Sequence, residues 1–178
     1  MQLLLRKLTG NSYIIPLIIF CICVWRIFVP QLPANNGLGW DGYRYYLLTV
    51  DGLQSQVLDS YLAFRIFPSL FIHVLFKVIG IAFTPANVIL AFKIMNTGLI
   101  TVSAWMVKKI FEKYQLNSVS QLTGFVLIFL NYGVLNFTFY NPVVTDTPAF
   151  FLSLELFYFF VRGELINILL IGLIGTFT

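Results

Sequence analysis

Long apolar segments separated by short polar connections are the feature of this sequence that most restricts its fold. A helix needs about 20 apolar residues to cross the hydrocarbon core of a bilayer. The candidate crossings are residues 13–29, 86–107, 119–140, 147–161 and 165–178. Only 10% of the residues are charged and 59% are hydrophobic, against about 25% charge in ordinary soluble domains. We therefore predict an all-α, polytopic membrane protein with about four to five transmembrane helices.

Basic residues gather at two places and set the expected orientation. Arg6 and Lys7 precede the first apolar segment, and Lys108, Lys109 and Lys113 follow the second. Because cytoplasmic loops of membrane proteins are enriched in lysine and arginine, both places are expected in the cytoplasm. The net charge of +4 is small and spread along the chain. It indicates an orientation in a lipid bilayer and no nucleic-acid partner.

Residues 30–85 are predicted to form a loop on the outer side. Residues 86–107 alone return the chain to the basic cluster, and a further crossing at 67–83 would leave that cluster outside. The short apolar segment 67–83 is therefore expected to lie on the outer face as a juxtamembrane amphipathic helix. Residues 53–67, LQSQVLDSYLAFRIF, place apolar side chains at helical spacing and predict a second such helix.

Two aspartates more than a hundred residues apart are expected on the same face. The same count of crossings carries Asp41 and Asp146 outside and returns Arg162 to the cytoplasm.

The last apolar segment, residues 165–178, gives roughly 21 Å of helix against a hydrocarbon core of roughly 30 Å. The chain is expected to be a single transmembrane domain, residues 1–178, from the N-terminal portion of a longer protein.

Asp41 lies in GWDGYRYY, between glycines and surrounded by aromatic residues. Glycines on both sides favour a flexible loop whose backbone a substrate can approach closely. An aspartate followed by glycine is also a common solvated turn. Both interpretations remain open, and the functional one makes Asp41 the candidate catalytic residue.

Asp146 lies in NPVVTDTPAFF, where Thr147 and Pro148 predict the start of a helix. An acid at that position is often only a partner of the helix dipole. Residues 147–161 span only about 22 Å, however, so the start of the helix is expected below the outer surface. Irregular backbone at that depth usually lines a cavity, and this favours a functional Asp146.

Several further polar residues lie in or near the apolar segments. Lys93 is inside residues 86–107, where a lysine either reaches back to the interface or faces a cavity. Arg65 and Arg44 are candidates for binding a lipid headgroup or a phosphate, and pairing with Asp41 is the alternative for Arg44. Glu155 is either functional or a protonated acid bonded to another helix. The asparagines expected to join helices are Asn96, Asn131 and Asn136.

The order of these segments resembles the N-terminal part of GT-C family glycosyltransferases, such as protein O-mannosyltransferases and aminoarabinose transferases. WDGYRYY resembles the acidic loop after the first helix, and FRIFPSLFIHVLFKVIG resembles the amphipathic segment before the second crossing. AFKIMNTGLITVSAWMVKKIF and NPVVTDTPAFFLSLELFYFF resemble the second crossing and the second outer loop. The likeness covers nearly the whole chain. The chain departs from the family at two points. Its first loop has a single acid where many members have an acidic pair, and Lys93 stands where many members have an arginine.

This resemblance implies a function and a location. A sugar would pass from a polyprenyl-phosphate donor to a hydroxyl of a glycan, lipid or protein acceptor. Asp41 would be the base, and Lys93, Arg65 or a divalent cation (Mg or Mn) would stabilise the departing phosphate. Asp146 would bind that metal ion or position the acceptor. The enzyme would lie in the bacterial plasma (inner) membrane with its active site facing outward.

Two other classes of function are compatible with the same residues. Acids near short, recessed helices also occur in transporters, so a transporter or a polysaccharide polymerase or flippase subunit is the first alternative. A non-catalytic membrane scaffold is the second. A zinc enzyme is not expected, because His73 is the only histidine and no CxxC or HxxxH pattern occurs.

Overall fold

Every regular element of the described chain is helical. The computed structural model describes residues 11, 13–63 and 65–178, and no strand occurs among them. The α-helices are α2 Ile14–Ile27, α3 Trp40–Asp51, α4 Ser60–Ala63, α5 Phe67–Ile79, α6 Pro85–Lys113, α7 Ser118–Phe129, α8 Thr138–Tyr140, α9 Asp146–Arg162 and α10 Leu165–Gly175. Two 3-10 turns, η1 Ala34–Gly37 and η2 Gly52–Gln54, and a π-helical turn, η3 Tyr132–Phe137, complete the set. The all-α prediction is confirmed.

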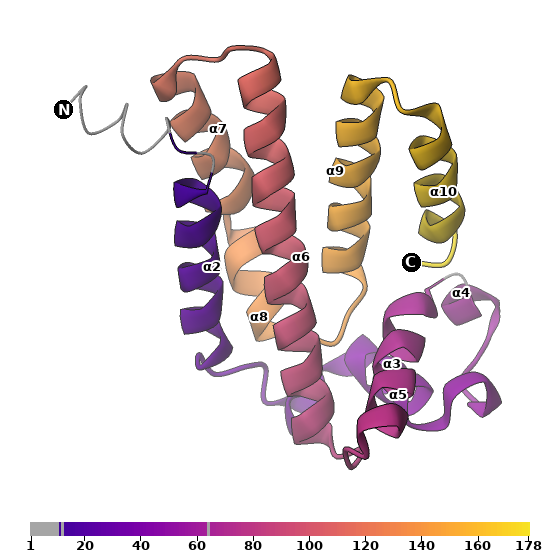
Figure 1. Cartoon of the computed structure of the whole chain (residues 1–178). Helices are drawn as coiled ribbons and strands as arrows, with labels where there is room; N and C mark the ends of the chain where they lie inside the picture. Colours follow the sequence, from indigo (N-terminus) through magenta and orange to yellow (C-terminus); the bar gives the residue numbers. More distant parts are fainter. Residues whose placement is uncertain (1–10, 12, 64) are drawn as a thin grey trace.

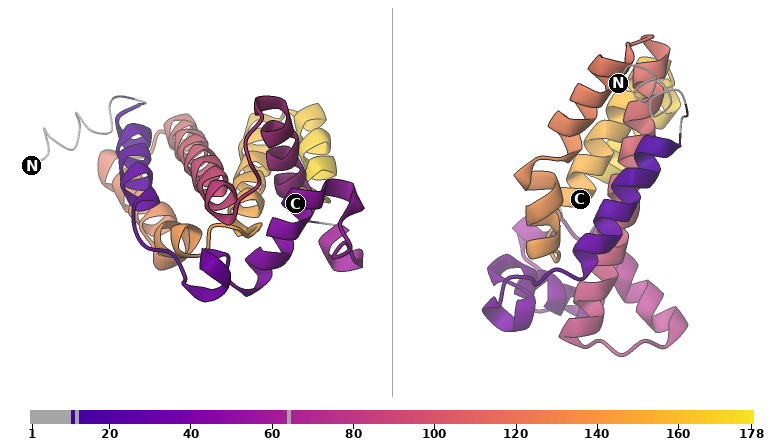
Figure 2. Two further views of the ribbon diagram at one scale, coloured as in Figure 1. Left: turned by 90° about the horizontal axis from the view of Figure 1, so that it is seen from below. Right: turned by 90° about the vertical axis from the view of Figure 1, so that its left-hand side faces the viewer.

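The long helix α6 lies at the centre of a bundle, with α2 on one side and α9 on the other (Figure 1). Helices α3, α4 and α5 gather at one end of the bundle (Figure 2). We call this end, which holds residues 30–63, 65–85 and 141–146, the acid end. The opposite end joins α6 to α7 and α9 to α10, and we call it the basic end. Asp41 and Asp146 therefore lie at the end opposite Lys113 and Arg162.

The packed core follows α6 along its length. Towards the middle of the bundle, Ile100 and Ala104 pack against Cys23 of α2 and against Phe125 and Phe129 of α7. Near the acid end, a second cluster joins α3, α5 and the start of α6; its buried members are Leu38, Tyr45, Leu62, Ile72, Phe76, Val88, Ile89, Phe92 and Val143. The helices at the acid end are thus anchored on the same central helix as the rest of the bundle.

Apolar side chains also cover much of the outer surface. On α5 the exposed stripe consists of Phe71, Val74, Leu75 and Val78, at helical spacing. The opposite face of the same helix is buried against α3 and α6. A helix that is apolar on both faces is typical of a buried or lipid-contacting position.

One helix, α6 with 29 residues, is long and apolar enough to cross a membrane by itself. The pair formed by α7 and the segment from Tyr132 to Tyr140 also qualifies if it is taken as one span. Helices α2, α5 and α10 are apolar but have only 14, 13 and 11 residues. By length, the described helices give one or two spans, fewer than the predicted four to five.

The predicted continuous helix over residues 119–140 is wrong, because the chain bends by 49° between α7 and the π-helical turn. Asn131 causes the break. Its side-chain nitrogen donates to the carbonyl oxygens of Leu127 and Ile128 at 3.1 and 2.8 Å, and its side-chain oxygen accepts from Val134 N at 2.9 Å. Asn131 therefore ends one helix and starts the next, and it does not join separate helices as expected.

Two predictions in the loop 30–85 also need correction. GWDGYRYY is not a flexible loop, because α3 begins at Trp40 immediately after Gly39, whose φ is +75°. Residues 53–67 do not form one helix. Hydrogen bonds from Ser55 N to Gly52 O and from Leu58 N to Ser55 O produce turns before the short helix α4. The predicted helix in residues 67–83 is confirmed as α5.

Gly42 offers a test of how tightly the acid end is packed. A Cβ atom at Gly42 would lie 2.9 Å from the carbonyl oxygen of Val143, whereas a Cβ atom at Gly98 in α6 would meet nothing within 4 Å. We expect Gly42→Ala to lower the free energy of unfolding by about 1–3 kcal/mol, because the clash involves main-chain atoms. Gly98→Ala is the control and should be neutral or stabilising by about 1 kcal/mol or less. Thermal unfolding in detergent, followed by tryptophan fluorescence, measures both; equal midpoints would show that the contact is loose.

Candidate functional site

Asp41 lies in the first turn of α3 and is exposed. The two glycines beside it allow close contact with the segment that leads to α9. A Cβ atom at Gly39 would lie 2.8 Å from the side-chain oxygen of Asn141, and one at Gly42 would lie 2.9 Å from Val143 O. The glycines in GWDG are therefore required by packing, and they leave the Asp41 carboxylate on the outer side of the helix.

Asp146 is the first residue of α9 and is exposed. It lines a cavity of about 180 Å³ between α6, η3 and α9. The predicted cap residue is wrong by two positions, because Thr145 precedes the helix. Thr147 instead shares a hydrogen bond of 3.1 Å with Thr138. Asp146 thus lies at a helix N-terminus and lines a cavity.

The two aspartates are brought to the same end of the bundle by segments that touch. The contact is between the Gly39–Gly42 stretch and the Asn141–Val143 stretch, and Leu32 N also donates to Tyr140 O at 2.8 Å. Each carboxylate has its own surroundings: Asp41 lies on the surface of α3, and Asp146 lies at its cavity. The candidate site therefore consists of two segments in contact at the acid end of the bundle, one carrying Asp41 and the other leading to Asp146.

The described residues contain no cluster of acidic, histidine or cysteine side chains around which a metal site could be recognised. No group of three or more histidine, cysteine, aspartate or glutamate side chains is gathered within the described ranges. Mg²⁺ and related ions are usually held by one or two carboxylates with further oxygen ligands. A site built on Asp146 and one further acid is not covered by this observation, so the metal role of Asp146 stays a prediction.

Lys93 is buried in α6, with 4% of its surface exposed. Its ammonium donates to Ile27 O at 2.9 Å and Val29 O at 3.3 Å, and to the side-chain oxygen of Gln31 at 3.0 Å. A lysine has three donors, so all of them are used within the protein. The ammonium satisfies carbonyl oxygens at the C-terminal end of α2 and fixes α2 to α6. Direct binding of a phosphate by Lys93 would require the loss of one of these bonds.

Arg26 is a cation near Lys93 that was not among the predicted site residues. It lies in the last turn of α2, and its guanidinium is close enough to Lys93 to repel the ammonium. One terminal nitrogen donates to the side-chain oxygen of Asn136, while Nε is buried without a hydrogen-bond partner among the described residues. In the sequence, the sign that could have pointed to Arg26 as part of the site is its place near the end of an apolar segment, in WRIFVP.

The other predicted cations lie further along the loop 30–85. Arg44 forms an ion pair of 2.6 Å with Asp59, so the alternative pairing with Asp41 is wrong. Asp59 also accepts a hydrogen bond of 2.9 Å from Leu62 N and thereby caps α4. Arg65 follows α4 and is half-buried. The structure places both arginines at the acid end, on the side of α4.

The remaining polar residues connect elements of the bundle. Asn96 donates to Pro142 O at 3.1 Å and Asn136 accepts from Arg26, so both asparagines join separate segments as expected. His73 ties α5 to α3 through a 2.8 Å hydrogen bond between Nδ1 and Thr49 O. Glu155 is half-buried in the middle of α9.

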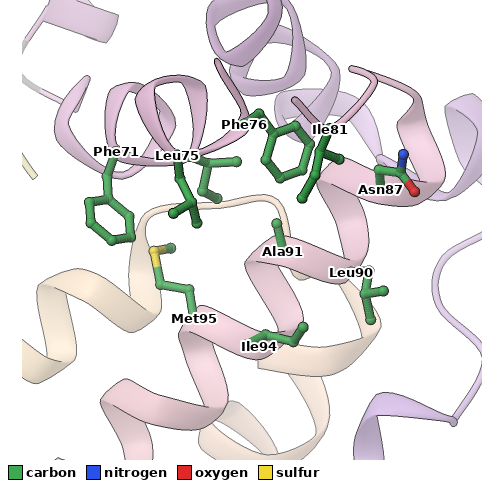
Figure 3. Close-up of a pocket in the computed structure, with 10 residues that line it drawn as sticks. Phe71, Leu75, Phe76, Ile81, Asn87, Leu90, Ala91, Ile94 and Met95 are labelled. Carbon is green, nitrogen blue, oxygen red and sulfur yellow. The ribbon is translucent and has the colours of Figure 1, made fainter. Parts of the chain in front are cut away.

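An apolar groove lies beside the acid end, between α5 and α6 (Figure 3). Phe71, Leu75 and Phe76 reach from α5 towards Ala91 and Met95 of α6. The cavity measures about 270 Å³, and a second apolar cavity of about 250 Å³ shares Phe71 and Met95 with it. The first cavity lies between α5 and α6, and the second is lined by α5, α6, α9 and the end of α10; we call these two neighbouring cavities the apolar groove.

Comparison with family models, with curated proteins and with solved structures found no match to this chain. The resemblance to GT-C glycosyltransferases rests on the order of the short motifs and on the side of the membrane predicted for each.

Lys93 allows a direct test of how α2 is held. We expect Lys93→Met to lower the free energy of unfolding by about 1–3 kcal/mol, because two main-chain oxygens and Gln31 lose their donor. Lys77→Met, at an exposed lysine of α5, is the control and should change it by less than about 0.5 kcal/mol. Thermal unfolding in detergent measures both variants. An unchanged midpoint for Lys93→Met would mean that the buried ammonium does not hold α2 in place.

Proposed function

We propose that this chain belongs to a membrane glycosyltransferase that moves a sugar from a polyprenyl-phosphate carrier to an acceptor hydroxyl at the outer face of the bacterial plasma membrane. The observation that carries the proposal is the contact between GWDG and the segment leading to Asp146. It brings two acids that are distant in sequence to one end of the bundle, beside the apolar groove.

The membrane placement rests on the apolar exterior of the bundle. We propose that α2, α6, the bent pair α7–α8, α9 and α10 lie within the bilayer, which gives the four to five crossings expected from the sequence. Helix α9 has 17 residues, or roughly 25 Å, so its start lies below the outer surface if its basic end reaches the other one. In this placement, Asp146 and the cavity that it lines both lie below the outer surface of the membrane.

The apolar groove supports a donor that is carried by a lipid. Its walls on α5 and α6 are almost entirely apolar, and Phe71 and Leu90 are 51% and 47% exposed. A polyprenyl chain is a long hydrocarbon, and burying it in such a groove removes apolar surface from water. The groove would hold the tail of the donor near the acid end, where its phosphate and sugar can meet Asp41.

The proposed reaction uses the residues as follows. Asp41 accepts the proton of the acceptor hydroxyl as its oxygen bonds to the anomeric carbon of the sugar. The bond between that carbon and the phosphate oxygen breaks, and polyprenyl phosphate leaves with the electron pair. Asp146 positions the acceptor at its cavity. The positive charge needed near the departing phosphate comes from Arg65, from Arg44 or from Arg26 together with Lys93. Lys93 must exchange one of its present hydrogen bonds to bind the phosphate.

A transporter or flippase subunit is the second candidate, and the bend at Asn131 is the observation that favours it. Interrupted helices that border a cavity with an acid are common at transport sites. The two functions differ in products: a glycosyltransferase releases polyprenyl phosphate, whereas a transporter or flippase subunit leaves the lipid-linked sugar intact. A non-catalytic scaffold would neither release nor move it.

Substitution of Asp41 tests the catalytic proposal. In the whole protein, Asp41→Asn keeps the shape of the side chain but removes the base, and we expect turnover to fall by about 10² or more. Asp51→Asn, at the exposed end of the same helix, is the matched control and should keep full activity. Asp59 is unsuitable as a control because it pairs with Arg44. Equal turnover of Asp41→Asn and wild type, at matched expression, would remove the base from the mechanism.

The orientation in the membrane can be measured with introduced cysteines. In a background without the native Cys21, Lys77→Cys should react with a membrane-impermeant thiol reagent in intact cells, and Tyr114→Cys should not. Both positions are exposed, whereas Lys108 is 1% exposed and would be a poor reporter. Labelling of position 114 and protection of position 77 would reverse the orientation and place the acid end in the cytoplasm.

A further inference from the structure

A cavity at the basic end has a strongly cationic lining. It measures about 370 Å³ and lies between the last turns of α6 and the end of α9. Its lining residues are Lys109, Ile110, Lys113, Tyr158, Val161, Arg162 and Glu164. Among these side chains, three are cations and one is a carboxylate. Nothing in the proposed sugar transfer uses this end of the molecule, because both acids lie at the other end.

The carboxylates near this cavity are already engaged in ion pairs. Glu112 pairs with Lys108 at 3.4 Å and with Lys109 at 2.9 Å. Glu164 pairs with Arg162. A single carboxylate shared by two lysines cannot neutralise both. Positive charge therefore remains at the cavity after these pairs have formed.

Lys113 adds to this excess. Its ammonium is exposed and donates to the main-chain carbonyl of Val161, which carries no net charge. A main-chain oxygen can be exchanged for an anion without breaking an ion pair. Lys113 is thus the cation at this end that is best placed to bind a ligand from outside.

Arg162 and Tyr158 provide hydrogen-bond donors at the same cavity. The Arg162 guanidinium lies 5.4 Å from the centre of the Tyr158 ring, and its Nη1 donates to the Tyr158 hydroxyl at 2.8 Å. Because the hydroxyl accepts that bond, its own hydrogen can point to another acceptor. An arginine, a lysine and a hydroxyl around one cavity match the charge and the several acceptor oxygens of a phosphate group.

Apolar side chains accompany these charges on α6 and α9. Ile110 and Tyr158 line the cavity and are 7% exposed, and the neighbouring positions Phe157 and Phe160 of α9 are 50% and 70% exposed. A soluble phosphate compound needs no such neighbours. A phospholipid does, because its headgroup enters the cationic cavity while its acyl chains lie along the exposed aromatic side chains.

We propose that this cavity binds the phosphate group of an anionic phospholipid in the cytoplasmic leaflet. The inference is independent of sugar transfer and needs only the membrane placement and orientation proposed above. Basic residues next to a membrane attract anionic lipids, and a fitted cavity turns this attraction into a defined site. The bound lipid would bridge α6 and α9 at the end where the two helices leave the core of the bundle.

Native mass spectrometry of the purified protein tests this proposal with phosphatidylglycerol and phosphatidylcholine of equal chain length. We expect wild type to bind phosphatidylglycerol about tenfold or more tightly. The double substitution Lys113→Gln and Arg162→Gln should remove this preference, and Lys113→Gln alone should weaken it. Lys77→Gln, at an exposed lysine near the acid end, should leave it unchanged. Equal binding of the two lipids by wild type, or an equal loss in Lys77→Gln, would overturn the proposal.

Two further measurements separate a lipid site from its alternatives. Inorganic phosphate at millimolar concentration should not compete with phosphatidylglycerol; competition would identify free phosphate as the ligand and overturn the assignment to a lipid. Arg162→Lys keeps the positive charge and should retain more of the preference than Arg162→Gln. Thermal midpoints accompany each variant, and Lys113→Gln, which alters an exposed side chain, keeps the test valid if the double variant does not fold. Failure of these tests would leave sugar transfer untouched, because that function is measured by release of polyprenyl phosphate.

Discussion

The buried ammonium of Lys93 is the interaction on which the arrangement of the acid end depends. It binds two carbonyl oxygens at the end of α2 and the side chain of Gln31, and so it fixes where the chain leaves the bundle. A charge buried in an apolar bundle is tolerated only when hydrogen bonds replace its water. After the end of α2, the chain passes through η1 to Gly39, and α3 begins in contact with Asn141.

That geometry links packing to the proposed function. Glycines at positions 39 and 42 let α3 approach the segment before α9 to within main-chain contact, which a larger residue would prevent. The close approach brings Asp41 and Asp146 to one end without neutralising either by an ion pair in the described structure. The same end borders the apolar groove. At the basic end, Lys109, Lys113 and Arg162 line one cavity.

The sequence predicted the features that depend on hydrophobic periodicity and on the order of charges. These features are the all-helical fold, the bounds of α5 to within about four residues, and the position of Asp41 and Asp146 at the same end of the bundle. The sequence did not predict features that depend on tertiary contacts. The bend at Asn131 arises because a side chain takes over main-chain hydrogen bonds, and the pairing of Arg44 with Asp59 arises because α4 folds back towards α3. Burial of Lys93 depends on the position of α2, which residue spacing in α6 does not report.

Photoaffinity labelling with a photoreactive polyprenyl phosphate shows whether a lipid-linked donor binds in the apolar groove, because it reports both the chemical class of the bound lipid and its position. The purified protein in lipid nanodiscs would be irradiated, and the labelled peptides would be identified by mass spectrometry. We expect labelling concentrated on α5 and the first half of α6, around Phe71 and Met95, and suppressed by excess unlabelled polyprenyl phosphate. Labelling spread evenly over all exposed apolar helices, and unaffected by the competitor, would contradict a lipid-linked donor bound in the apolar groove.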